Sequence, residues 1–182
     1  MKRFIGFNRL LLVGIVAAAA VLTLTQVAQA GPPPPVVPSK IQVADGNKVF
    51  LVGHAIGVQI YSCNGVAWGF VAPRANLYDD HGKLIITHFA GPTWQAMDGS
   101  RAVGQLVDFV TVDATAIPWV LLSASTAAGP DGDRLVATTF IQRIATTGGL
   151  APPAADCNAT TAGTVAEVPY TADYYFWKRT GS

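Results

Sequence analysis

The sequence predicts a single all-β domain, either an antiparallel β-sandwich or a partly closed β-barrel. Apolar residues recur with a period of two rather than 3.6, which is the pattern of half-buried strands. Clusters of Gly, Pro, Asn and Asp separate these short runs at nearly regular spacing, as expected for strands joined by tight turns. Residues 31–182 contain no helical pattern of useful length.

The first 30 residues are typical of a secretory signal peptide. Lys2, Arg3 and Arg9 form a basic start, residues 10–24 are apolar, and Ala28-Gln29-Ala30 supplies the small residues that a signal peptidase recognises. The apolar run is short for a membrane span, which needs about 20 residues. We expect cleavage after Ala30, export to the periplasm or the cell exterior, and no stable membrane anchor afterwards.

The 152 residues after the predicted cleavage site suit one domain. Residues 31–44 are interpreted as a Pro-rich tether, because the prolines of residues 31–38 fix φ and favour extended backbone. Residues 45–182 are interpreted as the single β domain. The chain after Ala30 carries nine Lys or Arg against 11 Asp or Glu, without a basic patch, which argues against a nucleic-acid partner.

Cys63 and Cys157 are the two cysteines of the chain. An even pair in an exported protein indicates a disulfide bond. On chain-entropy grounds, a disulfide that closes so long a loop stabilises the folded protein by at most about 4–5 kcal/mol. The alternative of a reactive thiol leaves the second cysteine unexplained.

The strands can be placed from alternation and turn residues. Residues 49–60 fit strands broken at Gly53 and Gly57, and Asn64-Gly65 then predicts a hairpin turn. Residues 79–83 predict the turn of a second hairpin. Further strands are expected at the following positions: residues 67–71, 75–78, 84–89, 101–112 with a bulge near Gly104, 117–122 buried on both faces, 135–146, and 168–177.

Residues 88–100 combine more special residue types than any other window of this chain. Gly91-Pro92 and Asp98-Gly99 predict two turns, and Trp94 between them supplies a large anchor. We expect the turns to hold Trp94 against the sheet, with His88 and Asp98 at one end of the resulting ledge. The competing interpretation is that Trp94 only plugs one end of the fold.

Five blocks of residues resemble a known family when taken in order. They are residues 57–63, residues 88–94 with 98–100, residues 118–122, residues 141–143 with 147–149, and residues 170–176. The sequence is similar in these blocks to a family of secreted bacterial and fungal proteins classed as a domain of unknown function. The resemblance spans roughly residues 45–178 and supplies no established catalytic residues.

Some fungal members of that family carry the label malate dehydrogenase, which this sequence does not support. A dinucleotide enzyme needs a Gly-rich turn between a strand and a helix to bind the pyrophosphate. No G-x-G-x-x-G occurs, and 152 residues are too few for the usual two domains. We therefore expect no cofactor.

The candidate ligand-binding residues are His88, Trp94, Asp98 and His54. Imidazole and carboxylate groups can bind metals or exchange protons near neutral pH. However, no H-x-H, H-E-x-x-H or C-x-x-C spacing is present, so the sequence predicts no metal site, and no G-x-S-x-G elbow marks a serine nucleophile. The sequence assigns no catalytic residues.

Two classes of function remain open at this point. The favoured one is a non-enzymatic binding or envelope-associated module, with a small molecule or a carbohydrate as the ligand. The alternative is a small hydrolase or metal-dependent enzyme that uses His88 and Asp98. A pocket that joins His54, His88 and Asp98 would favour the enzyme, and an aromatic groove without converging ionisable groups would favour the binding module.

Overall fold

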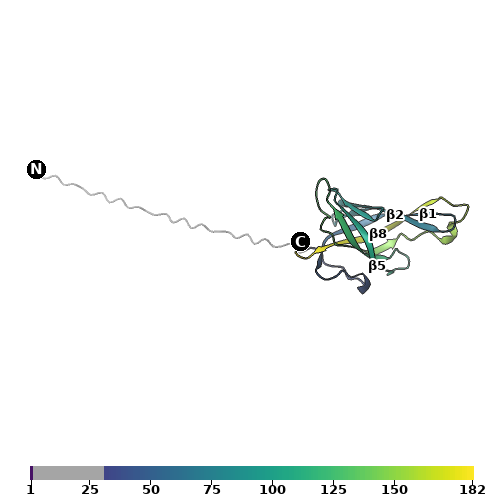
Figure 1. The fold of residues 1–182 in the computed structure, drawn as a ribbon, viewed down its shortest axis with the longest axis horizontal. Coiled ribbons are helices and arrows are strands. Elements are labelled where there is room, and N and C mark those ends of the chain that lie inside the picture. The colour runs from purple at the N-terminus through teal and green to yellow at the C-terminus, as the bar shows by residue number, and fades with distance from the viewer. Residues whose placement is uncertain (2–30) are drawn as a thin grey trace.

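The computed structural model describes Met1 and residues 31–182 (Figure 1). The predicted signal peptide, apart from Met1, lies outside the described residues. Within the described part of the chain, no helix has the length and apolar character needed to cross a membrane.

The described chain forms one antiparallel sheet of eight strands that closes into a ring. Each strand pairs with the next along the chain, and the last strand pairs with the first. The predicted all-β antiparallel class is therefore confirmed. The strands are β1 (Asn47–Cys63), β2 (Trp68–Tyr78), β3 (Leu84–Phe89), β4 (Thr93–Ala96), β5 (Arg101–Val110), β6 (Trp119–Ala127), β7 (Phe140–Gly148) and β8 (Val165–Arg179), with short 3-10 turns η1 (Ser39–Ile41) and η2 (Ala154–Asp156).

The longest strand pair is formed by β1 and β8, which pair from Asn47 with Arg179 to Ser62 with Val165. The predicted breaks at Gly53 and Gly57 are wrong, because β1 runs through both positions. Gly57 serves a different purpose. A Cβ atom there would overlap the carbonyl oxygen of Arg74, so glycine allows β1 and β2 to approach closely.

The two predicted hairpin turns are confirmed. The Asn64 side chain accepts hydrogen bonds from the backbone N–H groups of Val66 and Ala67, at 2.9 Å each, and shapes the turn between β1 and β2. Between β2 and β3, the Asp79 carboxylate accepts from the backbone N–H groups of His81 and Lys83. Short polar side chains that bond to nearby backbone favour turns over continued strand.

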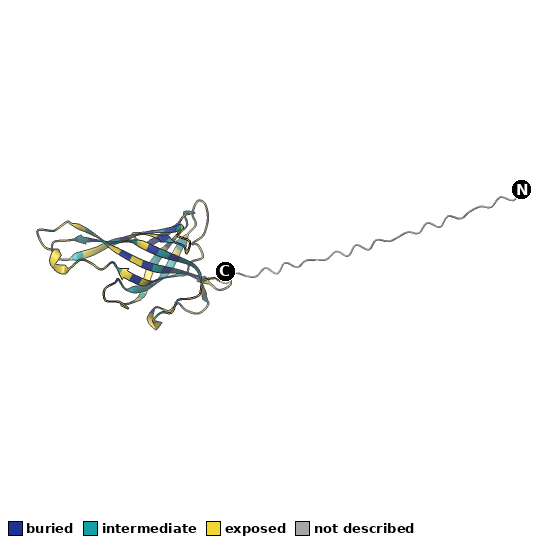
Figure 2. Ribbon diagram, turned by 180° about the vertical axis from the view of Figure 1, so that it is seen from behind, coloured by how far each residue is buried: buried dark blue, intermediate teal, exposed yellow. Residues whose placement is uncertain are grey.

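The main hydrophobic core fills the inside of the ring. Alternate residues of β8 point inward and are almost fully buried, as the period-two pattern predicts; they are Tyr170, Ala172, Tyr174 and Phe176. Figure 2 shows buried and exposed residues alternating along the strands. Trp94 and Leu77 pack into the same core.

A second, smaller core lies on the outer face of the sheet under η1. Ile41 is buried against Leu121 and Ile144, and its carbonyl oxygen accepts a hydrogen bond from Nε2 of Gln142 at 2.6 Å. Leu121 is buried in this outer core, whereas Leu122 is buried in the inner one. The prediction that this segment is buried on both faces is therefore confirmed.

The chain between β6 and β7 differs from the prediction. The expected strand from residue 135 begins only at Phe140. Leu135 lies in a turn, where its backbone N–H donates to Oγ of Ser100 at 3.1 Å and its side chain is buried. The bulge expected near Gly104 also lies elsewhere, between Leu106 and Asp108.

The predicted disulfide bond between Cys63 and Cys157 is confirmed. Their Cα atoms lie 5.4 Å apart, within the range that a disulfide spans. The bond ties the end of β1 to the loop that follows η2 and precedes β8. This region forms the end of the molecule farthest from the C-terminus in Figure 1.

The ring is incompletely paired on one side. β2 pairs with β3 only between Ala75 and Tyr78, so its first half lacks a neighbour on that side among the described residues. β5 pairs with β4 only through residues 101–103, so its second half also lacks a strand neighbour on that side within the described part of the chain. The strands β3 and β4 are too short to bridge the whole distance, and the ring has a lateral opening between β2 and β5.

Candidate functional site

His88 lies inside the ring on β3, opposite Trp94 of β4. Its Nδ1 atom is 2.9 Å from the carbonyl oxygen of Thr93, which can only accept, so Nδ1 carries the hydrogen. The imidazole stacks on the Trp94 ring, with centroids 4.1 Å apart and an angle of 10° between the planes. Tyr174 meets both rings edge-on.

Burial lowers the pKa of His88 to about 3, because the charged imidazolium would lose its hydration. The positive charge of Arg143 lowers this pKa further, whereas the hydrogen bond to Thr93 opposes the shift. His88 is therefore neutral at physiological pH, and its ring packs as part of an aromatic cluster.

Asp98 lies in the turn between β4 and β5 and stabilises that turn. One carboxylate oxygen accepts from Oγ and the backbone N–H of Ser100, and the other accepts from the backbone N–H of Arg134. These hydrogen bonds lower the pKa of Asp98, with the Ser100 hydroxyl as the largest cause. The carboxylate thus joins two loops, and both of its oxygens accept hydrogen bonds from the protein itself.

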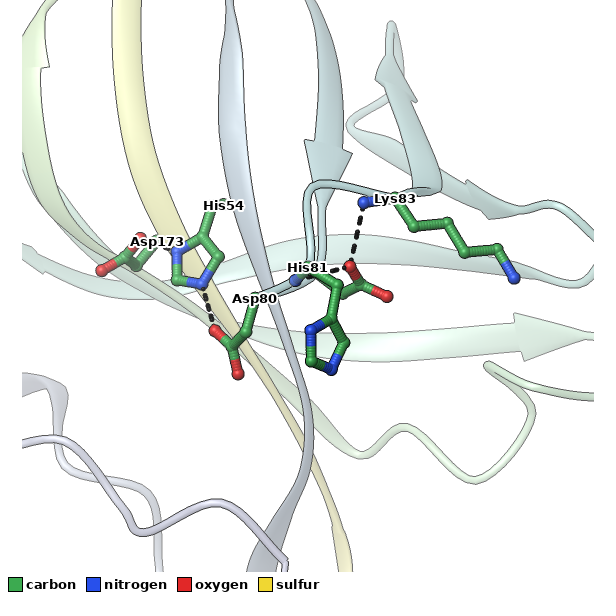
Figure 3. Close-up of polar contacts among 6 residues, drawn as sticks. His54, Asp80, His81, Lys83 and Asp173 are labelled. Atoms are coloured by element: carbon green, nitrogen blue, oxygen red, sulfur yellow. Dashed lines mark hydrogen bonds and ion pairs between the residues drawn. The ribbon is translucent and has the colours of Figure 1, made fainter.

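His54 lies on the outer surface of β1, between two carboxylates (Figure 3). Its Nδ1 is 2.7 Å from Asp173 and its Nε2 is 2.9 Å from Asp80. The hydrogen bonds to Asp80 and then to Asp173 raise the pKa of His54, since both favour the protonated ring. The backbone N–H groups of His81 and Lys83 donate to the neighbouring Asp79 carboxylate, and the Lys83 side chain extends away from His54 in the same view.

The structure therefore joins only two of the four candidate residues, His88 and Trp94. His54 and Asp98 have hydrogen-bond partners of their own, and no described cavity is lined by both histidines and Asp98. Across Met1 and residues 31–182, no group of three or more His, Cys, Asp or Glu side chains is arranged to hold a metal ion.

A pocket of about 300 Å³ lies at the lateral opening of the ring. Its inner wall is formed by buried side chains of the core, namely Trp94, Leu122 and Tyr174. Its mouth is formed by exposed apolar side chains from the two strand segments that flank the opening, namely Phe70, Val71 and Leu106. We call this cavity the lateral pocket.

Two polar residues line the lateral pocket among these apolar groups. Arg143 projects from β7, and its Nε and Nη2 atoms donate to the carbonyl oxygen of Pro118 at 3.3 and 2.8 Å. Gln59 projects from β1 and is 3% exposed, yet its Nε2 has no hydrogen-bond partner among the described residues. A smaller hollow of about 200 Å³ adjoins the pocket and is also lined by Gln59, Phe70 and Arg143.

Sequence reasoning identified Trp94 as part of this region but missed Arg143 and Gln59. Alternation places Arg143 on the same face as Ile141, which is completely buried in the inner core. A charged residue two positions from a buried core residue on the same strand is the signal that could have identified Arg143. The opposite face of β7 is also buried, at Gln142 and Ile144, so the pattern alone did not reveal which face was inner.

A closed ring of antiparallel strands with an apolar pocket opening through its side defines a small β domain with an interior cavity. The family comparison agrees with the resemblance found in the sequence. Residues 44–178 match the model of a family described as a protein of unknown function, DUF3455, and the chain belongs to that family. Comparisons with curated proteins and with solved structures gave no match.

Proposed function

We propose that this protein is an exported, non-enzymatic domain that binds a small apolar molecule in the lateral pocket. The pocket carries the proposal, because it combines an aromatic inner wall, an opening to solvent and a volume at the lower end of the usual range for small-ligand sites. The surrounding sheet supplies the frame, since every strand pairs with a neighbour on each side along at least part of its length.

The enzymatic alternative gains no support from the geometry of His88 and Asp98. His88 is stacked and buried with a pKa of about 3, so it is unsuited to exchange protons near pH 7. Asp98 uses its carboxylate oxygens to join two loops. Neither side chain lines the lateral pocket.

Export is supported by the basic, apolar and small-residue segments of residues 1–30 and by the Cys63–Cys157 disulfide bond. Mass spectrometry of the protein recovered from the cell exterior or the periplasm tests this part of the proposal. We expect a mature chain that begins at Gly31, and a chain that still begins at Met1 would contradict cleavage.

Binding can be tested with N-phenyl-1-naphthylamine, an uncharged probe whose fluorescence rises in apolar surroundings. We expect saturable binding to the purified chain of residues 31–182. Val120 lies in the pocket wall on β6, and Val120→Trp should fill the cavity and abolish the signal. Val165→Trp places the same bulk at an exposed position of β8 and should leave binding unchanged.

Two results would contradict the binding proposal. One is an absence of saturable fluorescence with the unaltered protein. The other is equal binding by the Val120→Trp and Val165→Trp variants, since the probe would then bind outside the lateral pocket. Thermal unfolding of both variants shows whether the Val120→Trp protein remains folded.

A further inference from the structure

We propose that the lateral pocket selects an amphipathic acid, with the carboxylate bound by Arg143 and the apolar body held against Trp94 and the mouth of the pocket. This inference rests on the proposed binding function and adds the chemical class of the ligand. Such a ligand would match the charge of Arg143, the unpartnered amide of Gln59 and the apolar surface around them.

Arg143 is a half-buried cation without a countercharge. Its two hydrogen bonds go to the neutral carbonyl oxygen of Pro118, and it forms no ion pair with a carboxylate in the described part of the chain. A guanidinium group has five N–H donors, so three remain without an acceptor there. A charge placed in low-dielectric surroundings is costly unless it is paired, and an anion in the pocket would pair it.

Gln59 adds a second polar group in the same place. Its side chain is almost fully buried, it lines both the lateral pocket and the adjoining hollow, and its Nε2 lacks an acceptor among the described residues. Buried amide N–H groups are nearly always hydrogen-bonded, because the unpaired state costs about 1–3 kcal/mol. A carboxylate bound to Arg143 has enough lone pairs to accept from Gln59 as well.

The remainder of the pocket suits an apolar body. Phe70, Val71 and Leu106 at the mouth are each more than half exposed, although they are large and apolar. A ligand that covers them would remove this surface from water, which is favourable by about 25 cal/mol per Å². Trp94, Leu122 and Tyr174 add apolar and aromatic surface at the inner end of the pocket.

Three ligands of matched shape test the preference for an acid: 4-phenylbutyrate, 4-phenyl-1-butanol and 4-phenylbutylamine. Each is used to displace N-phenyl-1-naphthylamine from the unaltered protein. We expect the carboxylate to bind about tenfold or more tightly than the alcohol, and the amine to bind weakest, because a charge-assisted hydrogen bond is stronger than a neutral one. Equal affinities for the acid and the alcohol would overturn the inference while leaving the binding function intact.

Variants then assign the preference to Arg143. Arg143→Gln should weaken phenylbutyrate binding about tenfold or more and leave phenylbutanol binding within about twofold. Arg143→Lys keeps the charge and should retain part of the preference. Arg101→Gln removes the same charge from the exposed side of β5, where Arg101 bonds to Gln95, and should change neither affinity.

The outcomes separate the two proposals. If none of the three compounds and no N-phenyl-1-naphthylamine binds, the binding function itself fails. If the acid is preferred but Arg143→Gln and Arg101→Gln reduce that preference equally, the preference comes from the overall charge and the assignment to Arg143 is wrong. If Arg143→Gln does not fold, the comparison of the three compounds on the unaltered protein still tests the choice of an acid.

Discussion

His88 and His54 project from strands of the same sheet, but they occupy opposite environments. His88 lies inside the ring, 3% exposed and stacked on Trp94, and burial lowers its pKa to about 3. His54 lies on the outer face between Asp80 and Asp173, and these two carboxylates raise its pKa. The comparison shows that the face of the strand, rather than the residue type, decides what a histidine contributes.

The largest difference between a buried and an exposed aromatic side chain should appear when Trp94 is shortened. Trp94→Ala leaves a cavity in the inner core and should lower the free energy of unfolding by about 3–5 kcal/mol. Phe70→Ala removes an aromatic ring that is 57% exposed and should cost less than about 1 kcal/mol. Chemical denaturation measures the free energy of unfolding of both variants. Similar decreases in the two variants would show that the aromatic cluster of Trp94 and His88 is not the structural centre.

The buried histidine should make the protein less stable in acid. The unfolded chain binds a proton at His88 below about pH 6.5, whereas the folded protein resists protonation until about pH 3. His88 should therefore lower the free energy of unfolding by about 2 kcal/mol between pH 7.5 and pH 5.0. His88→Phe keeps the stacked ring and should lose this part of the pH dependence, as measured by denaturation at both pH values.

His54 on the surface should change the free energy of unfolding with pH in the opposite direction to His88, and by a smaller amount. The pKa of His54 is raised in the folded protein. Its contribution to the free energy of unfolding is therefore complete below about pH 6.5, and is lost as the pH rises through the folded-state pKa. Exposed ion pairs contribute about 0.2–1 kcal/mol. Comparing His54→Gln with the unaltered protein should show a stability difference at pH 5.5 that shrinks by pH 8.5. A difference that grows with pH would contradict the contacts to Asp80 and Asp173.

Much of the fold followed from the sequence because alternation and turn chemistry are local signals. The turns at Asn64, Asp79 and Asp98 are encoded by side chains that bond to backbone two to four residues away. The sorting of β8 residues into two faces followed from its period of two, and the structure shows which face is inward. The disulfide pairing followed from having only two cysteines in a chain with an export signal.

The pocket could not be predicted because it depends on how distant strands meet. Arg143 and Gln59 lie on β7 and β1, which are not hydrogen-bonded neighbours, and only closure of the ring brings them to the same cavity. His88 and Asp98 are close in sequence, but their side chains serve the interior and a turn, respectively. The strand predicted over residues 135–146 begins only at Phe140, because β-branched composition does not reveal that the backbone N–H of Leu135 bonds to Ser100 instead.

The pairing of β1 with β8 also constrains the order in which the protein folds. During synthesis β1 emerges well before β8, with residues 64–164 between the two strands, and Cys63 must wait for Cys157. Non-local strand pairing is slow because loop closure costs entropy before the contacts form. Until the final strand arrives, the growing chain presents a long unpaired β1 edge, which is a site where other chains can add strands. Truncation within residues 165–179 should therefore yield an aggregation-prone chain rather than a smaller domain.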